Sequence, residues 1–457
     1  MLRRLVLLAA FAMAFSSIGH YPADALIDLQ ALIDEAEPWS ILTLTPGIYE
    51  GGVLIDKPLE IRGGGWPIID GGGEGTTIEI EASDVTITGL VIRNTGDSLD
   101  RENAGISADA PRVKITGNRF ENVLFGIFLR HGDDSIVSYN EIGSIDADLA
   151  RRGDGIRLWE SDRALVEGNT VDGGRDTVLW FSDDIVVRDN VVSNGRYGIH
   201  FMYSDNALVE RNYLSNNSVG GFLMYSFNLT LRDNLITGSQ GPSGYGIGLK
   251  DIDGVEATGN RFIGNRVGVY FDNAPATRGV EHHFSNNLFA YNETGAVFLP
   301  SVEGNVFTNN AFVDNGEQVG VQGKGDFEGN VWTVGTAGNY WSDFAGYDAD
   351  ADGIGDVAYR LNDLFSTLTD NNPDLRFFDQ TPASRAIDLA ARMFPTFRPR
   401  PKVEDTAPLI EIPEIPVGIT GAGDTSSAGI LIAALAMLGG SATLLLIARG
   451  PRREVQT

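Results

Sequence analysis

The chain has 457 residues, of which 42% are hydrophobic and 56 are glycine, and it contains no cysteine. Its formal net charge of -28 excludes non-specific binding to nucleic acid, because affinity for phosphates needs clustered Lys and Arg. The lack of cysteine excludes disulfides and thiolate metal sites. The acidity fits either cationic partners or a saline habitat, and both interpretations stay open.

The first residues predict an exported protein. Two arginines precede an apolar run, and an A-x-A cleavage motif ends at Ala25. This pattern is typical of a secretory signal peptide, which we place at residues 1–25.

Residues 26–380 predict a β-solenoid. Residues 27–37 form an amphipathic segment that we expect to be a short capping helix, and alternating strand runs broken by Pro-Gly, Gly-Gly and Lys-Pro follow it. The segments DTVLWFS, GIHFMYS and GGFLMYS begin at positions 176, 198 and 220, so one unit repeats every 22 residues. Such a fixed period indicates coils that bury their apolar faces by stacking on their neighbours.

An asparagine recurs before an apolar strand at nearly the same period. Asparagine tolerates the left-handed backbone of a corner and can hydrogen-bond its counterpart in the next coil, so we predict a structural ladder. Its ten predicted members are Asn118, Asn140, Asn169, Asn190, Asn212, Asn234, Asn260, Asn287, Asn310 and Asn330.

A second register aligns the strands whose pattern resembles GIxL. Leu129, Leu158, Leu179, Phe201, Leu223, Leu249 and Phe271 form one apolar column, which we expect to face the core. The residues on either side must point outward, because side chains alternate along a strand. The methionine column is Arg130, Trp159, Trp180, Met202, Met224, Lys250 and Asp272; the histidine column is Phe128, Arg157, Val178, His200, Phe222, Gly248 and Tyr270.

These outward columns contain tryptophan, methionine and histidine where a solvated face would be polar, which indicates a binding face. In this register Met202 and Met224 are vertical neighbours, and His200 lies two positions before Met202. Two thioethers and an imidazole favour copper, particularly Cu(I). Methionines also fill apolar docking surfaces well, so docking remains an alternative. Trp159, Trp180, Phe222, Lys250 and Tyr270 complete the predicted binding face.

The segments DGIRLWES (154–161), GRDTVLWFS (174–182), GRYGIHFMYS (195–204), VGGFLMYS (219–226), GPSGYGIGLKD (241–251) and RVGVYFDNAP (266–275) resemble the NosD family, periplasmic accessory proteins of nitrous oxide reductase maturation. The resemblance covers residues 27–380 approximately and implies a right-handed parallel β-helix. It further implies a partnership with an ABC transporter permease and its ATPase, a copper chaperone lipoprotein as donor, and nitrous oxide reductase as acceptor. We therefore expect a non-enzymatic protein that delivers copper.

The same fold also carries polysaccharide lyases, epimerases and hydrolases, so an enzyme is the alternative. Such an enzyme needs convergent carboxylates or a carboxylate with a base. The candidates are Asp183, Asp184, Asp205, Lys250, Asp251 and Asp272. Turns after strands favour aspartate in any case, and Lys250 and Asp272 are placed to form an ion pair between coils.

Asp348, Asp350, Asp352, Gly353 and Asp356 follow the spacing of a calcium loop. A tyrosine occupies the place of the usual bidentate glutamate, so the sequence predicts either a partial Ca²⁺ site or an acidic turn.

Three further histidines carry weaker signals. His282 and His283 are adjacent and must point to opposite faces of a strand, and His131 lies in a turn. We expect these histidines to be exposed to solvent.

The C-terminal part predicts a membrane anchor. Residues 381–427 are expected to be a linker, with an extended proline-rich spacer at 398–416. Residues 428–448 form an uncharged apolar run of roughly the 20 residues needed to cross a bilayer. Arginines follow the run, so we place residues 449–457 in the cytoplasm and the main body on the outer face of the membrane.

Overall fold

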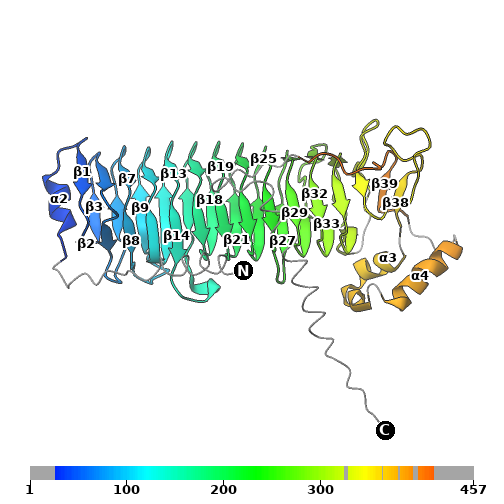
Figure 1. The fold of residues 1–457 in the computed structure, drawn as a ribbon, viewed down its shortest axis with the longest axis horizontal. Helices are drawn as coiled ribbons and strands as arrows, with labels where there is room; N and C mark the ends of the chain where they lie inside the picture. The colour runs from blue at the N-terminus through cyan, green and yellow to red at the C-terminus, as the bar shows by residue number, and fades with distance from the viewer. Residues whose placement is uncertain (1–25, 324–327, 363, 379–380, 395–399, 416–457) are drawn as a thin grey trace, which may run out of the picture.

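The computed structural model describes residues 26–415 except 324–327, 363, 379–380 and 395–399. Within these ranges the chain forms a parallel β-helix, as the repeats predicted (Figure 1). The predicted signal peptide, membrane segment and cytoplasmic tail lie outside the described residues. None of the helices in the described part is long and apolar enough to cross a bilayer.

Three parallel sheets form the walls of the β-helix, and we name each sheet after its first strand. The β1 sheet contains β1 (Ile41–Leu44), β4 (Glu60–Gly63), β7 (Thr86–Thr88), β10 (Lys114–Thr116), β13 (Ile136–Ser138), β16 (Leu165–Glu167), β19 (Val186–Arg188), β22 (Leu208–Glu210), β25 (Thr230–Arg232), β28 (Glu256–Thr258), β31 (His282–Ser285) and β34 (Asn305–Thr308). The β2 sheet contains β2 (Ile48–Glu50), β5 (Ile68–Asp70), β8 (Val91–Arg93), β11 (Arg119–Val123), β14 (Glu141–Ser144), β17 (Thr170–Asp172), β20 (Val191–Ser193), β23 (Tyr213–Ser215), β26 (Leu235–Thr237), β29 (Arg261–Ile263), β32 (Leu288–Ala290), β35 (Ala311–Val313) and β37 (Tyr340–Trp341). The β3 sheet contains β3 (Val53–Ile55), β6 (Ile78–Ile80), β9 (Ala104–Asp109), β12 (Phe125–Arg130), β15 (Ile156–Trp159), β18 (Asp176–Trp180), β21 (Tyr197–Met202), β24 (Val219–Met224), β27 (Tyr245–Lys250), β30 (Val267–Asp272), β33 (Thr294–Phe298) and β36 (Glu317–Val321).

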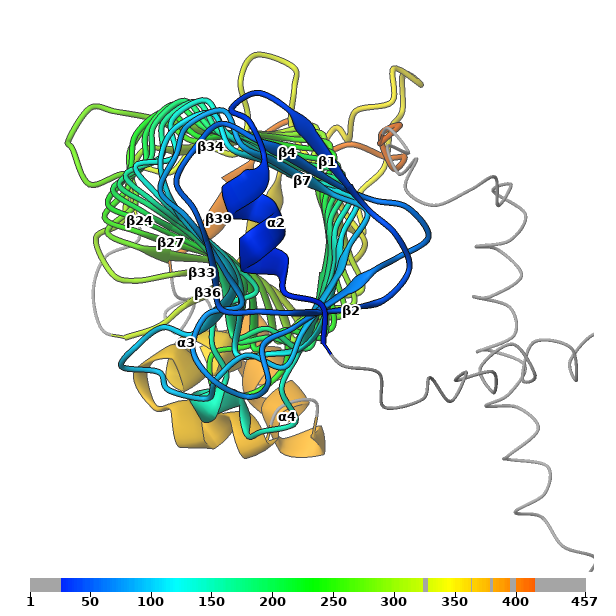
Figure 2. The ribbon, with the colours of Figure 1, turned by 90° about the vertical axis from the view of Figure 1, so that its left-hand side faces the viewer.

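The winding is right-handed, as the resemblance implied. Seen from the N-terminal end in Figure 2, the chain passes clockwise from the β1 sheet to the β2 sheet and then to the β3 sheet as it recedes. This hand is the one that parallel strand crossovers adopt almost without exception.

A short helix closes the N-terminal end of the β-helix. The helix α2 (Leu29–Glu35) lies across the opening of the first coil (Figure 2) and buries Leu29 and Ile33 in the core. Asp28 caps it by accepting a hydrogen bond from the backbone N–H of Ala31. The predicted capping helix is therefore confirmed, and it covers core that an open end would expose.

The asparagine ladder is confirmed with one correction. From Asn118 to Asn310, each side chain donates to the side-chain oxygen of the corresponding asparagine in the next coil. Asn310 pairs with Asn339 and not with the predicted Asn330, which bonds Asn305 in a separate, shorter ladder. The chain carries extra residues between Asn310 and Asn339, so this coil is longer than the 22-residue period. Counting by the period therefore selected Asn330 in place of Asn339.

Beyond the last coils the chain becomes mixed in structure. The strands β38 (Tyr359–Leu361) and β39 (Val403–Asp405) pair antiparallel, and α3 (Leu364–Asn371), the 3₁₀ helix η2 (Pro373–Phe378) and α4 (Pro382–Met393) lie at this end (Figure 1). A second 3₁₀ helix, η1 (Leu149–Arg151), lies in a loop between β14 and β15. The boundary between the β-helix and the linker, placed between residues 380 and 381, stays a prediction. The predicted linker contains the helix α4 and the strand β39.

Asp405 of β39 ties this terminal region to the β-helix. Its buried carboxylate accepts hydrogen bonds from the backbone N–H of Asn339, from Trp341 Nε1 and from the hydroxyl of Thr333. Because Asn339 ends the ladder, β39 supplies the partner that a further coil would otherwise provide.

Candidate functional site

The β3 sheet holds both outward columns in the predicted register. Trp159 pairs with Trp180, Trp180 with Met202, and Met202 with Met224 on successive strands. The histidine column aligns equally well, with Val178 opposite His200. The register between β18 and β21 shifts by one residue at the start of β18, where Asp176 pairs with Tyr197.

The two columns differ in how deeply they are buried. Every residue of the methionine column from Trp159 to Asp272 is half-buried. The histidine column lies deeper, and its Val178, His200 and Tyr270 are at most 9% exposed. The outward face is therefore not uniformly solvated.

His200 occupies an aromatic pocket in the histidine column. Its ring meets Tyr197 edge-on at a centroid distance of 4.9 Å and Trp180 at 5.2 Å. Neither ring nitrogen makes a hydrogen bond, and the indole Nε1 of Trp180 also lacks a partner. These three are among the ten buried side-chain N and O atoms without a partner in the described part of the chain. Such atoms are costly in a folded protein, because burial removes their hydrogen bonds to water without replacing them.

A buried carboxylate lies behind the His200 ring. The side chain of Asp176 is 2% exposed, and its Oδ2 lies 3.5 Å from His200 Nδ1. Arg196 holds the same carboxylate through two hydrogen bonds, and the Tyr197 backbone N–H donates to Oδ1. Burial acts to raise the pKa of Asp176, and interactions with His200 and Arg196 outweigh it, so the pKa lies below its usual value. The sequence reasoning missed Asp176 and Arg196 as parts of the site.

A second buried carboxylate stands one coil away. Burial raises the pKa of Asp154 to about 6, against the opposing effect of Arg157. Arg157 pairs with Asp154 at 2.7 Å and with Glu102 at 2.6 Å, and its guanidinium lies 5.9 Å from the Trp180 ring centroid. This ionic cluster fixes the edge of the aromatic pocket on the side of β15.

The three predicted ligands lie on two neighbouring strands of the β3 sheet. Met202 and Met224 are paired neighbours on β21 and β24, about 4.8 Å apart at the backbone, and His200 is two residues from Met202, about 6.7 Å along the strand. Flexible thioethers bridge such separations by choice of rotamer. The imidazole nitrogens of His200 have no hydrogen-bond partner, and imidazole is a donor that copper accepts beside sulfur.

The other residues of the predicted binding face make aromatic contacts in one part and an ion pair in another. Trp159 and Trp180 meet edge-on at 5.7 Å, and Phe222 is half-buried against Tyr197. Lys250 bonds Asp272 at 2.8 Å, as the ion-pair interpretation predicted. Tyr270 is stacked on Tyr245 at 4.3 Å and is 9% exposed, so it packs between coils.

An aromatic ladder, exposed at Phe181 and Tyr203 and half-buried at Tyr225, borders the methionine column, and the sequence reasoning did not find it. Phe181, Tyr203 and Tyr225 directly follow the three strands, and their rings stack at 5.2 and 5.0 Å. All three have positive φ angles, between 52° and 54°, which bulky side chains rarely adopt. The repeated LWFS, FMYS and LMYS endings were the signal for this corner.

The carboxylates considered for an enzyme have structural partners. Asp183 accepts the backbone N–H of Asp205, and Asp205 accepts that of Phe227, so these two carboxylates link successive coils. Lys250 is paired with Asp272 and also with Asp251. Asp184 lies at a corner with a φ of 56°. Their positions follow from turn and ladder geometry.

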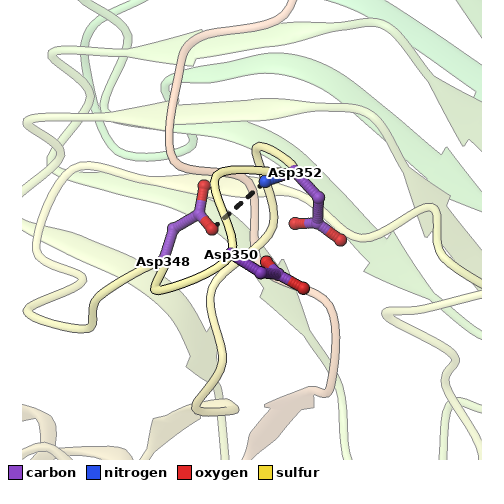
Figure 3. A group of neighbouring side chains, drawn as sticks. All are labelled: Asp348, Asp350 and Asp352. Carbon is purple, nitrogen blue, oxygen red and sulfur yellow. Dashed lines mark hydrogen bonds between the residues drawn. The ribbon is translucent and has the colours of Figure 1, made fainter.

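The predicted calcium loop gathers three of its four carboxylates. Ligand oxygens of Asp348, Asp350 and Asp352 lie within 4.8 Å of one another (Figure 3). Asp348 accepts backbone N–H groups of Asp352 and Gly353, which hold its pKa below the usual value, whereas the neighbouring Asp352 raises the pKa of Asp350. Asp356 accepts the N–H of Ala349 and closes the loop. The geometry fits both a cation loop and an acidic turn.

The remaining histidines are placed differently from one another. His131 and His283 have side chains that are 59% and 44% exposed, as predicted. His282 was predicted to be exposed, but it is fully buried and its Nε2 lies 3.1 Å from the Ile252 carbonyl oxygen. Adjacent residues on β31 do point to opposite faces, and His282 takes the inward one. Burial lowers its pKa to about 4.

Fold and face together define a class: a parallel β-helix that carries methionine, histidine and aromatic side chains in register on one wall. Residues 139–346 match the family described as "Periplasmic copper-binding protein (NosD)". A relative from Pseudomonas aeruginosa, named "Probable ABC transporter binding protein NosD", is 37% identical over 89% of this chain and 95% of its own length. A relative of the same name from Stutzerimonas stutzeri is 34% identical over 87% of this chain and 92% of its own. The chain belongs to the NosD family.

Solved structures with a similar fold are distant in sequence. The A-module of the mannuronan C-5 epimerase AlgE6 from Azotobacter vinelandii matches with a TM-score of 0.48 and 17% identity, over 68% of this chain and 96% of that one. The A-module of AlgE4 from the same organism gives a TM-score of 0.46 and 15% identity, over 69% of this chain and 98% of its own.

Proposed function

We propose that this protein is an exported, non-enzymatic subunit of a copper-processing ABC system, and that it passes Cu(I) to nitrous oxide reductase during maturation. His200, Met202 and Met224 hold the ion in a shallow site on the β3 sheet. The transporter permease and its ATPase, a copper chaperone lipoprotein and the reductase are the proposed partners. Cu(I) is cargo that moves by ligand exchange, and a partner hydrolyses any ATP.

The observation that carries the proposal is the pair of buried, unpartnered nitrogens of His200 beside two methionines in register. The described family and the names of the relatives agree with copper binding and with a transporter partner. The half-buried methionine column keeps the site open to a donor and an acceptor, which transfer by ligand exchange requires.

A Cu(I) titration against a competing chelator tests the site. The His200→Ala, Met202→Ala, Met224→Ala triple variant should bind Cu(I) at least about 100-fold more weakly than the wild type, because its three ligands act on one ion. The matched control is the His283→Ala, Met393→Ala double variant. It removes an exposed histidine and a 68% exposed methionine elsewhere. Equal affinity in wild type and triple variant would eliminate the proposed site.

A conservative variant separates copper binding from apolar docking. Met202→Leu with Met224→Leu keeps the volume and apolar character of the surface but removes both sulfur atoms. Copper binding predicts a large loss of Cu(I) affinity in this variant with unchanged partner binding. If Cu(I) affinity stays the same and only alanine substitutions weaken partner binding, the face is a docking surface alone.

Calcium in the loop from Asp348 to Asp356 is a second ligand that we propose, in a structural role. The clustered carboxylates and the glycine with a φ of 87° at position 353 support it. Millimolar Ca²⁺ should raise the thermal midpoint of the wild type but not of an Asp350→Asn, Asp352→Asn variant. The exposed pair Asp146→Asn, Asp148→Asn makes the same charge change in another loop. An equal Ca²⁺ effect in both variants would rule the loop out.

An activity assay tests the enzyme alternative. The carboxylates proposed for it are engaged in ladders and ion pairs, so polyuronides and alginates should pass unchanged through incubation with the full-length protein. Depolymerisation or a change in uronate composition would overturn the non-enzymatic assignment.

A further inference from the structure

We infer that Asp176, held by Arg196, is a positioning residue that orients His200 and keeps its Nε2 lone pair available as the nitrogen ligand. The inference rests on the proposed copper site and adds to it the groups that prepare the ligand. The observation behind it is the contact between one ring nitrogen of His200 and a carboxylate that is fixed from its other side.

The carboxylate is immobilised before any metal arrives. Arg196 Nε donates to Oδ1 at 2.9 Å, and a second guanidinium nitrogen donates to Oδ2. Such two-point pairing is geometrically specific. The Tyr197 N–H adds a third donor to Oδ1 at 3.2 Å. The remaining side of Oδ2 faces His200 Nδ1, and this is the part of the carboxylate that the imidazole can contact.

The paired carboxylate determines which nitrogen carries the proton. An ionised carboxylate only accepts hydrogen bonds, so a neutral imidazole facing it is favoured with the proton on Nδ1. The Nε2 lone pair is then free, and it is a buried atom without a protein partner. Metal-bound histidines commonly donate their other N–H to a carboxylate in this way. At 3.5 Å the contact is longer than a hydrogen bond, and we infer that it shortens when a cation binds Nε2.

The Tyr197 and Trp180 rings restrict rotation of the imidazole. They approach it nearly at right angles, with interplanar angles of 75° and 86°. A ring flip that exchanged Nδ1 and Nε2 would have to displace these contacts. The orientation set by Asp176 is therefore maintained by packing as well.

His131, in the turn directly after β12, offers a matched contrast. Its Nδ1 lies 2.7 Å from Asp109, but its Nε2 lies 3.2 Å from Glu160, so both nitrogens face carboxylates. The hydrogen bond to Asp109 raises the pKa of His131, and Glu160 occupies the side of Nε2 that a metal would need. An aspartate beside a histidine is thus not enough to prepare a metal ligand. His200 differs from His131 because its second nitrogen has no partner.

Two measurements on the full-length protein test the inference. The ¹⁵N shifts of labelled histidine, assigned by difference from a His200→Gln spectrum, report the tautomer of His200 without copper. We expect Nδ1–H in the wild type and loss of that preference in Asp176→Asn. Cu(I) affinity should fall about 10- to 100-fold in Asp176→Asn and stay unchanged in the Asp109→Asn control. The Asp176→Asn, Arg196→Gln double variant avoids an unpaired buried guanidinium and should show the same loss.

The outcomes separate this inference from the proposed function. An Nε2–H tautomer in the wild type, or unchanged Cu(I) affinity in both Asp176 variants, would overturn the positioning role while leaving a copper site standing. Absence of Cu(I) binding by the wild type would overturn the copper site and the ligand role of Nε2 together. Loss of affinity with a disturbed tautomer, in variants whose thermal unfolding stays cooperative, would support the inference.

Discussion

The asparagine ladder and the surroundings of His200 are both buried and polar, but the ladder side chains are fully hydrogen-bonded and the His200 side chain is not. Asn212 is typical of the ladder: its amide donates to Val187 O and to Asn234, and its oxygen accepts from the backbone and side chain of Asn190. His200, equally enclosed on the neighbouring wall, leaves both nitrogens unpaired. The polar groups of the ladder stabilise the fold, whereas the unpaired nitrogens of His200 lower its stability.

Breaking the ladder should give the largest effect. Asn212→Leu removes four side-chain hydrogen bonds and leaves buried partners unsatisfied, so we expect a loss of about 3 kcal/mol or more. The urea unfolding midpoint measures it. Asn228→Gly is the control: it removes an exposed hydrogen bond to Asn206 and keeps a backbone with a φ of 55°. Equal losses in the two variants would show that burial of the ladder is not what matters.

His282 lies between these extremes, with one nitrogen bonded and the other unpaired. Its pKa is lowered from 6.5 to about 4, so the unfolded chain binds the proton more tightly. The stability it contributes is present above about pH 6.5 and is lost as pH falls toward 4, by about 3 kcal/mol in all.

Comparing unfolding at neutral and acidic pH measures this contribution. His282→Leu should lose less stability on acidification than the wild type, while His283→Leu on the exposed face should behave like the wild type. Identical acid sensitivity of His282→Leu and wild type would contradict the assignment.

Removing the unpaired nitrogens of His200 should have the smallest effect on stability. In His200→Phe an apolar ring replaces the imidazole in the aromatic pocket, so the free energy of unfolding should stay within about 1 kcal/mol or rise. Copper binding should nevertheless be lost. A destabilisation as large as that of Asn212→Leu would mean that His200 has structural partners after all.

Much of this arrangement could be predicted from the sequence, because a fixed period places equivalent residues on one wall. The pairing of Trp180, Met202 and Met224 was predicted residue by residue and is confirmed. Asn339 was missed because an insertion interrupts the period. The burial of His282 was missed because alternation does not say which of two adjacent residues faces the core.

The surroundings of His200 could not be predicted in the same way. Asp176 and Arg196 both belong to repeated segments, but the register shifts at the start of β18, where Asp176 pairs with Tyr197, so the repeat does not predict their contact with each other or with His200. Period and alternation fix the direction of a side chain, but its burial and its partners depend on neighbouring loops. The site residues themselves remain a prediction until copper binding is measured.

X-ray absorption at the copper edge tests the central claim most directly, because it counts the ligands on Cu(I) bound to the full-length protein. We predict two sulfur donors and one nitrogen donor in the wild type. The Met202→Leu, Met224→Leu variant should lose the sulfur signal. A coordination shell of nitrogen and oxygen alone in the wild type would contradict a copper site built from His200, Met202 and Met224.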